Sequence, residues 1–337
     1  MKKTLIYSVI LSFMLIPFAL QAQELSLKQL QTRLSKLESI MNHTQPSHPL
    51  NNLKVSGVLE VETTHTEGFN DSQEDTSDTR LATFELAMAT PVNQYTEASV
   101  TFLYEEQDTP FEVDTASISI SDNSNLNLTF GQVYLPFGAF ETHQVNDTLA
   151  LEIAEIRNSA LIAGYGRNGF SAQGYVFATQ ENKLNQGGFR VGFRNNHINV
   201  YTDFINNALN SDAFQTLAEE DPQFSNLTDT PAISVHLGAQ ISDLLIQCEH
   251  LALDSIGGLN ITSSQLEASY HLDNFSLALS LQQTKDAQAL NLPLQRVSYT
   301  TTMNILHNTQ LAIELWRDED KDHHLSNNFI IQAAVTF

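Results

Sequence analysis

The chain has 337 residues, a formal net charge of -23 and a slightly negative mean hydropathy of -0.19. This hydropathy excludes a helical membrane protein, but it is compatible with a transmembrane barrel, in which only one face of each strand meets lipid. The acidity argues against nucleic acid as a partner and against adhesion to anionic lipid. It suits a surface or lumen that attracts cations, and equally a soluble acidic surface.

The first 22 residues have the features of a secretory signal peptide. Lys2 and Lys3 precede an apolar run that ends near the small residue Ala22. No cysteine follows this run, so we expect no lipoprotein anchor. The single cysteine, Cys248, cannot form an internal disulfide. We therefore predict an exported protein in which Cys248 occupies a lipid-facing strand position.

Residues 23–42 have the apolar seam of a short coiled coil. Spacings of three and four residues separate Leu27, Leu30, Leu34, Leu37 and Met41. A lone helix of this length is marginal in water, so it should self-associate in the periplasm or dock on the rest of the chain. Self-association would produce a homo-oligomer. Residues 43–53, which include Pro46 and Pro49, form a linker.

From residue 54 to the end, apolar and polar residues alternate, which predicts strands. The clearest run is F-S-L-A-L-S-L-Q, which begins at Phe275, and the last strand ends on the aromatic residue Phe337. We count sixteen strands of about ten residues. An even number of strands can close into a barrel without an unpaired edge. We therefore predict an all-β chain that forms a transmembrane antiparallel up-and-down β-barrel over residues 54–337.

Two kinds of connection alternate along these strands. Short ones built on Pro, Asn, Asp, Gly or Ser lie at 91–94, 122–124, 167–168, 195–196, 242–243, 273–274 and 305–307. The others are mostly longer and acidic, at 65–78, 134–159, 207–230, 285–293 and 318–326. Short periplasmic turns that alternate with long outer loops are typical of bacterial outer-membrane barrels. We therefore expect outer-membrane lipid around the barrel, and recognition of Phe337 by the barrel-assembly machinery.

The faces opposite the apolar ones should line the lumen. Their acidic and histidine residues are Glu60, Glu62, Glu85, Glu97, Glu105, Asp203, Glu249, Glu267, Glu314, His236 and His271. The basic residues are fewer: Lys54, Arg190, Arg194 and Arg296. An arginine facing mid-bilayer lipid costs roughly 2–4 kcal/mol, so these side chains should point inward. Opposed charges across a lumen would orient solutes, although they can equally serve only to keep the interior hydrated.

Segment 134–159 is the best candidate for a loop folded into the pore. It holds too many aliphatic residues for a solvated outer loop, including Leu149, Leu151 and Ile153. These should pack on the barrel wall and narrow the bore, so that charged residues face the solute. The charged candidates are Glu141, His143, Asp147, Glu152 and Glu155. The alternative is a loop that rests on the barrel rim.

We expect neither a metal site nor catalysis. The run Asp318–His324 is rich in cation ligands, but it lacks the glycine of a calcium loop and falls in a connection between strands. The sequence contains no G-x-S-x-G motif, and its serines and histidines form no recognisable catalytic set. We expect no cofactor.

The run L-T-F-G-Q-V-Y-L-P-F-G-A-F-E-T-H, Leu128–His143, together with the N-terminal heptads and the strand count, resembles the LbtU-type siderophore porin family. Only Gly131–Phe140 is motif-like, and other porins also carry a G-x-x-x-x-P-F-G stretch. The resemblance implies outer-membrane uptake of an iron–siderophore complex, without ligand residues that can be transferred. Residues 23–53 are too few for the plug of an energised receptor.

Two transport hypotheses follow from these features, and a third possibility is a structural barrel, anchored by the N-terminal helix, that conducts nothing. The first is a passive porin that carries an iron–siderophore complex. The second is a general diffusion porin with a preference for cations. Ferric siderophores are often anionic, so the acidic lumen would suit them only if Arg190, Arg194 and Arg296 cluster.

Overall fold

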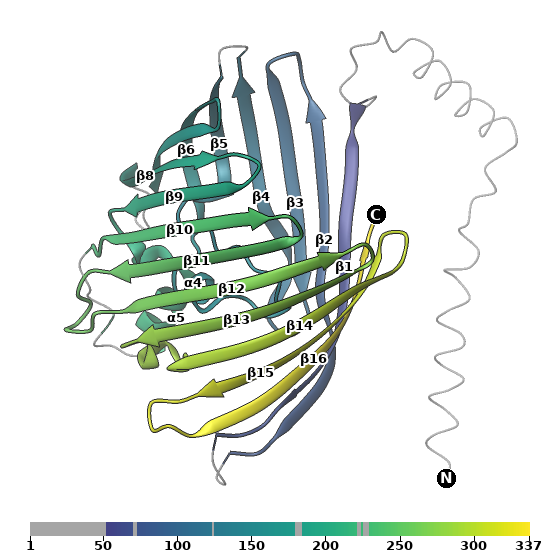
Figure 1. Ribbon diagram of the computed structural model, residues 1–337. Helices are drawn as coiled ribbons and strands as arrows, with labels where there is room; N and C mark the ends of the chain where they lie inside the picture. The colour runs from purple at the N-terminus through teal and green to yellow at the C-terminus, as the bar shows by residue number, and fades with distance from the viewer. Residues whose placement is uncertain (1–51, 70–72, 123–124, 179–183, 221–223, 225–228) are drawn as a thin grey trace, which may run out of the picture. The chain divides into compact units, whose positions relative to one another are not determined.

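A computed structural model describes residues 52–69, 73–122, 125–178, 184–220, 224 and 229–337 (Figure 1). The predicted signal peptide and helix, and nearly all of the predicted linker, lie outside the described residues. Residues 52–337 form one compact unit. Among the described helices, none combines the length and apolar character needed to span a membrane.

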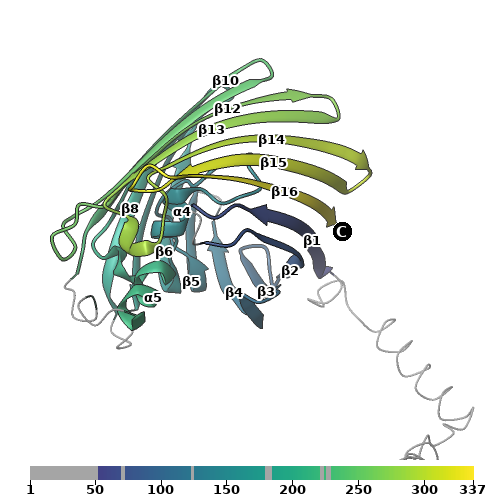
Figure 2. The ribbon, with the colours of Figure 1, turned by 90° about the horizontal axis from the view of Figure 1, so that it is seen from below.

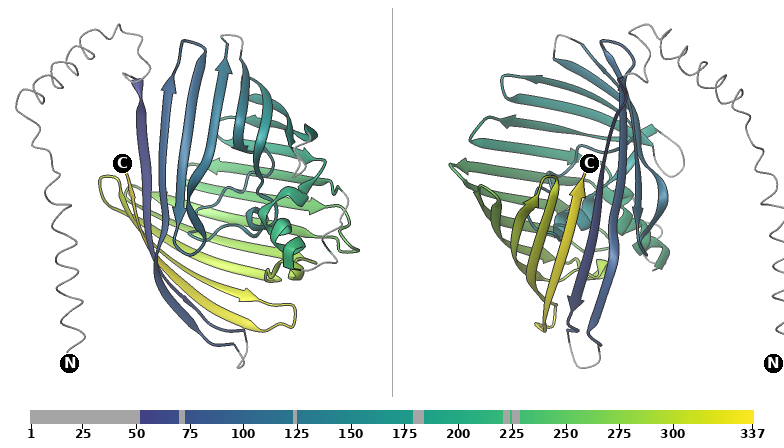
Figure 3. Two further views of the ribbon diagram at one scale, coloured as in Figure 1. Left: turned by 180° about the vertical axis from the view of Figure 1, so that it is seen from behind. Right: turned by 90° about the vertical axis from the view of Figure 1, so that its right-hand side faces the viewer.

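Sixteen strands of the described chain close into one antiparallel barrel in which each strand pairs with its neighbours in sequence. The first eight are β1 (Lys54–Thr66), β2 (Thr76–Pro91), β3 (Thr96–Glu105), β4 (Thr109–Ser121), β5 (Leu126–Tyr134), β6 (Arg157–Arg167), β7 (Phe170–Ala178) and β8 (Leu184–Arg194). The others are β9 (Ile198–Ile205), β10 (Ala232–Ile241), β11 (Leu244–Leu253), β12 (Thr262–Leu272), β13 (Phe275–Lys285), β14 (Gln295–Leu306), β15 (Thr309–Glu319) and β16 (Leu325–Thr336). Figures 2 and 3 show the ring of strands from below, from behind and from one side. The predicted all-β barrel is confirmed.

Alternation of side chains explains the two faces of the sheet. On β13, Leu279 and Leu281 are 50% and 43% exposed on the outside, whereas Ser280 and Gln282 are buried inside. Cys248 pairs with the outward residues Leu237 and Leu266, which places it on the outer face as predicted. An apolar outer face around a closed sheet is stable only in lipid. The protein is therefore a barrel of the bacterial outer membrane.

The C-terminal residue closes the barrel. Phe337 and Gly57 exchange two backbone hydrogen bonds of 2.9 and 3.0 Å, beyond the β1–β16 ladder. A Cβ atom at position 57 would collide with the Phe337 ring, so glycine leaves the space that this ring occupies. The aromatic end of the chain thus lies across β1. Its recognition by the assembly machinery stays a prediction.

Loop lengths follow the predicted alternation with two differences. The first outer loop is shorter than 65–78, because the β1–β2 ladder continues to Thr66 and Thr76. The link between β3 and β4 is also short, although it lies on the side of the longer loops. The links at the other end are tight turns, such as 168–169, 242–243 and 273–274.

Candidate functional site: a passage narrowed by an internal loop

A segment that we call the pore loop, residues 135–156, runs along the inner wall of the barrel. It leaves β5 and reaches side chains of β9, β11, β12, β13 and β15 before it enters β6. Its helix α4 (Leu149–Ala154) lies inside the ring of strands in Figures 1 and 2. The structure thus places the predicted loop inside the lumen and not on the rim.

Four buried carboxylates hold the backbone of the pore loop. Asp203 accepts a hydrogen bond from Gly138 N at 3.0 Å, and Glu249 accepts from the next two amides at 2.8 and 2.7 Å. Further along, Glu267 accepts from His143 N, and Glu314 from the amides of residues 145 and 146. Hydrogen bonds from amides to ionised carboxylates are stronger than neutral ones. These lumen acids therefore bind the loop and do not face the solute.

The P-F-G part of the sequence motif is held against the barrel wall by Arg190 and Asp203, and we call this contact the clamp. Arg190 donates two hydrogen bonds to Asp203, at 2.8 and 2.9 Å, and a third to Gly138 O at 2.6 Å. Gly138 has φ +74°, and a Cβ there would collide with the ring of Phe140. Only glycine meets both conditions without strain. The sequence revealed the motif, but not this partner pair.

An apolar core fills one side of the lumen. Thr148 caps α4 by accepting a hydrogen bond from Leu151 N at 3.1 Å, and the helix buries Leu149 and Ile153 completely. The same core includes inner wall residues such as Phe177 and Leu251. The loop 207–230, predicted only as an outer connection, contributes Phe214 and Leu217 from α5 (Asp212–Glu220). This apolar core occupies that side of the lumen among the residues that the structure describes.

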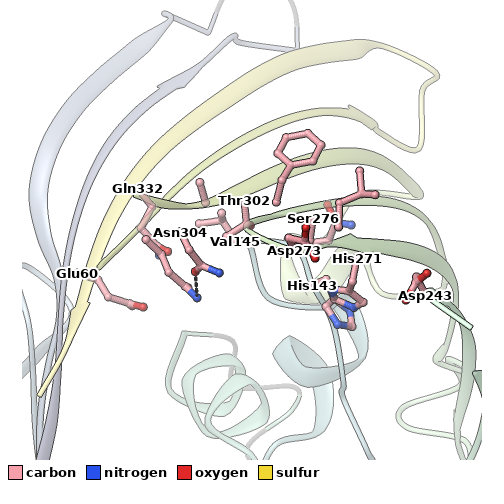
Figure 4. Close-up of a pocket in the computed structure, with 15 residues that line it drawn as sticks. Glu60, His143, Val145, Asp243, His271, Asp273, Ser276, Thr302, Asn304 and Gln332 are labelled. Carbon is pink, nitrogen blue, oxygen red and sulfur yellow. Dashed lines mark hydrogen bonds between the residues drawn. The ribbon is translucent and has the colours of Figure 1, made fainter. Parts of the chain in front are cut away.

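The opposite side of the lumen holds two water-accessible cavities. The outer cavity, about 650 Å³, is bounded by β1, β2, β3, β15, β16 and the pore loop. The inner cavity, about 550 Å³, reaches the short turns at Asp243 and Asp273 (Figure 4). Glu60, Val145 and Gln332 line both cavities, and we call these three residues the junction. The two cavities therefore share lining residues from β1, β16 and the pore loop, and this shared lining marks the candidate route through the barrel.

The outer cavity is strongly acidic. Six carboxylate residues line it: Glu60, Glu62, Asp78, Glu105, Asp108 and Asp147. Arg80 is the only lysine or arginine among its described lining residues, and it pairs with Asp108 at 2.8 Å. Facing carboxylates in an enclosed channel attract cations and repel anions.

The structure separates the predicted site residues into distinct places. Asp147 lines the outer cavity, and His143 lines the inner one. Glu152 binds Arg296 at 3.2 Å, and Glu141 binds Arg194 at 2.8 Å. Asp203 is only 1% exposed beneath the loop, and Glu155 is the C-cap residue of α4.

The three lumen arginines do not form one basic cluster. Arg190 and Arg194 lie on β8 and flank the ring of Tyr201, at 5.4 and 5.5 Å from its centroid. Arg296 lies on β14 and pairs with Asp318 at 2.9 Å. Each of the three has a carboxylate partner. Within the part of the chain that the structure describes, these three arginines therefore offer little unpaired positive charge for an anion.

Two residues of the junction were missed from the sequence. Val145 and Gln332 have no special chemistry, and their meeting depends on the strand register and on the path of the pore loop. Arg80 was also missed, because alternation from Phe84 and Leu86 would turn it toward lipid. The β1–β2 register shifts between Glu60 and Val61, which brings Arg80 opposite Glu62. Glu60 and Glu105 were found by alternation alone.

Enclosure raises the pKa of loop carboxylates. Burial, followed by the nearby charges of Asp147, Asp212 and Asp114, raises the pKa of Glu155 from its ordinary 4.5 to about 7, and Arg157 opposes this. Burial likewise raises the pKa of Asp147 and of Glu152.

The Glu155→Gln variant should therefore remove part of the pH dependence of stability. Because the folded-state pKa is raised, the contribution of Glu155 is fully present below pH 4.5 and is lost as the pH rises through 7. At pH 8 we expect the variant to be more stable than the wild type by about 1–2 kcal/mol, a value reduced for solvent screening. Urea unfolding in lipid at pH 5 and 8 measures this. Glu220→Gln, on the exposed end of α5, is the control. If the free energy of unfolding changes equally between pH 5 and pH 8 in the wild type and both variants, the raised pKa of Glu155 is contradicted.

Loop residues Asp320, Asp322 and His324 come together on the outer side of β15 and β16. Their possible ligand atoms lie within 4.8 Å of one another, and His324 Nδ1 is 3.0 Å from Asp320 Oδ2. This is the segment in which we predicted no metal site. Exposed acidic groups often gather without a metal, so the prediction stands untested.

Comparison with known proteins places the fold and leaves the cargo open. No family model matches the chain. The UPF0422 proteins lpl2888 and lpg2959 of Legionella pneumophila, strains Lens and Philadelphia 1, are 24% and 25% identical to it over 344 residues. Each match covers 88% of this chain and 64% of the relative, so the chain spans less than two thirds of these relatives. Neither name mentions siderophores.

Solved porin structures share the architecture. Salmonella typhi OmpF, determined with daunomycin, gives a TM-score of 0.66 at 11% identity, covering 85% of this chain and 97% of its own. An anion-selective porin from Comamonas acidovorans gives 0.63 at 10% identity, covering 85% and 99%. OmpT of Vibrio cholerae without loop L8 gives 0.59 at 13% identity, with the same coverage. At these identities the likeness shows that the chain has the porin fold.

Proposed function

We propose that the protein is a passive outer-membrane porin whose passage favours cations. The observation that carries this proposal is the charge of the outer cavity, where six carboxylate residues face one arginine. Glu60 extends this charge into the junction, which every solute on this route must pass. The apolar core that includes α4 occupies the other side of the lumen, so these groups line the route that the two cavities mark.

Current–voltage measurements in planar bilayers test the selectivity. Under a KCl gradient we expect a reversal potential of the sign set by K⁺, and a shift toward zero for Glu60→Gln. The Glu220→Gln variant keeps the charge of the passage and should match the wild type. A reversal potential set by Cl⁻ would contradict the proposal.

A narrower proposal is that the cargo includes an iron–siderophore complex. The resemblance of Leu128–His143 to the siderophore porin family supports it. The pairing of Arg190, Arg194 and Arg296 with carboxylates favours a neutral or cationic complex over an anionic one. Uptake of neutral and anionic ferric complexes into liposomes that contain the protein distinguishes these cases. If K⁺ crosses and neither ferric complex does, the siderophore proposal is contradicted and the porin proposal is not.

A further inference from the structure

Two histidines meet in the inner cavity, from parts of the chain far apart in sequence. His143 belongs to the pore loop, and His271 lies near the end of β12. Their ring centroids are 5.1 Å apart, with planes at 60°. Figure 4 shows the two rings together at the wall of the cavity, with Asp243 and Asp273 on the same side.

A buried carboxylate sets the tautomer of His143. Glu267, whose side chain is 0% exposed, lies 2.8 Å from His143 Nδ1 and also accepts from the His143 backbone amide. Since a carboxylate only accepts, Nδ1 carries the proton, and Nε2 keeps its lone pair. Histidines that bind metals usually donate the other ring nitrogen to a carboxylate or carbonyl in this way. His143 is therefore oriented as a metal ligand.

The spacing of the two rings fits a shared ion. Zinc binds histidine nitrogen at about 2.0–2.1 Å with tetrahedral angles, so two rings on one ion have centroids about 5 Å apart. The observed separation of 5.1 Å agrees with this distance. His271 is exposed to the cavity, so its ring can turn to present a nitrogen.

The charge of the inner cavity favours a cation at this point. Asp243 and Asp273 line it with the two histidines, and none of its described lining residues is lysine or arginine. Imidazole nitrogen suits zinc, copper, nickel and iron, whereas calcium and magnesium prefer oxygen ligands.

We propose that His143 and His271 form a binding site for a divalent transition-metal ion within the passage. Water completes the coordination. The site lies on the side of the short turns, which is the periplasmic side of an outer-membrane barrel. It is separate from the selectivity proposed above, because it depends on two imidazole ligands in the inner cavity and not on the carboxylates of the outer cavity.

Calorimetric titration of Zn²⁺ into the folded, untagged, full-length protein tests the site. We expect saturable binding to the wild type, and a loss of affinity of at least about tenfold in His271→Ala. His271 holds no part of the pore loop, so its removal should leave the fold intact, which circular dichroism verifies. Ca²⁺ should bind no more tightly to the wild type than to this variant.

The control variant is His324→Ala, which disrupts the separate loop cluster and should leave the His271-dependent binding unchanged. Equal Zn²⁺ affinity in the wild type and His271→Ala would overturn the proposal, as would the absence of binding to the wild type. Bilayer currents provide a second readout, in which Zn²⁺ added on the side of the short turns lowers the wild-type conductance and not that of His271→Ala. Zn²⁺ binding by a protein that conducts no current would contradict the porin function and support the metal site. Conductance without Zn²⁺ binding would support the porin function and contradict the metal site.

Discussion

Replacing Arg190 with alanine is expected to lower the free energy of unfolding by about 3 kcal/mol or more. The substitution leaves the carboxylate of Asp203, 1% exposed, without its guanidinium partner. It also removes the hydrogen bond from Arg190 to Gly138 O, so that the pore loop is held at this point only by the hydrogen bond from Gly138 N to Asp203. Urea unfolding of the barrel in lipid vesicles, followed by tryptophan fluorescence of Trp316, measures the change.

A matched control is Arg80→Ala. Arg80 also pairs with an aspartate at 2.8 Å, but the side chains of Arg80 and Asp108 are 34% and 60% exposed. Exposed pairs contribute about 0–1 kcal/mol, so this variant should stay close to the wild type. The double variant Arg190→Ala, Asp203→Asn should recover part of the loss, because the neutral amide is less costly to bury. Similar effects of Arg190→Ala and Arg80→Ala would contradict the role given to the clamp.

Deleting residues 141–156 is expected to raise the single-channel conductance severalfold. The deletion removes Val145 from the junction and α4 from the apolar core, which opens both sides of the lumen. Single-channel recording in planar bilayers measures the change.

A milder variant is needed as well, because the deletion exposes the apolar inner wall to water and the deleted protein can fail to fold. Glu314→Ala removes the acceptor for the amides of Val145 and Asn146 and leaves α4 in place. It should increase the conductance less, with more current noise from a loosened loop. Wild-type conductance in both variants, once folded, would mean that the pore loop does not limit the flow.

The barrel itself could be predicted from the sequence, because its signals are local. Alternation gave the faces of the strands, turn residues gave the short links, and the last strand ended on an aromatic residue. The contact of Phe337 with Gly57 could not be predicted, since it depends on the β1–β16 register across most of the chain. The same limit hid the junction, where Gln332 and Val145 meet.

The sequence showed that the acidic side chains point into the lumen, but it did not show that they bind the pore loop. Alternation pointed Asp203, Glu249, Glu267 and Glu314 inward, and an acidic lumen suggested contact with solutes. Inside the barrel, however, the irregular backbone of the pore loop needs acceptors for its amides, because buried amides are rarely left unpaired. The four carboxylates supply those acceptors. A sequence without the path of the loop cannot distinguish the two roles.

The two loops that pack inside the barrel differ in the strength of their sequence signals. The aliphatic residues around Leu149 and Ile153 marked the pore loop as internal. The loop 207–230 carried a weaker signal, with Phe214 and Leu217 three residues apart in a polar segment. Such a pair is enough to bury one face of the short helix α5, but not enough to indicate which surface it covers.

The route of solutes past the pore loop is tested most directly by a cysteine at the junction. In a Cys248→Ser background, Val145→Cys should react with a charged thiol reagent added to either side, and each modification should reduce the single-channel current. Ala150→Cys, at a position 2% exposed in the apolar core, should stay unmodified. A Val145→Cys channel that conducts normally after exposure to the reagent, or a block that appears only with Ala150→Cys, would contradict the route between β1, β16 and the pore loop.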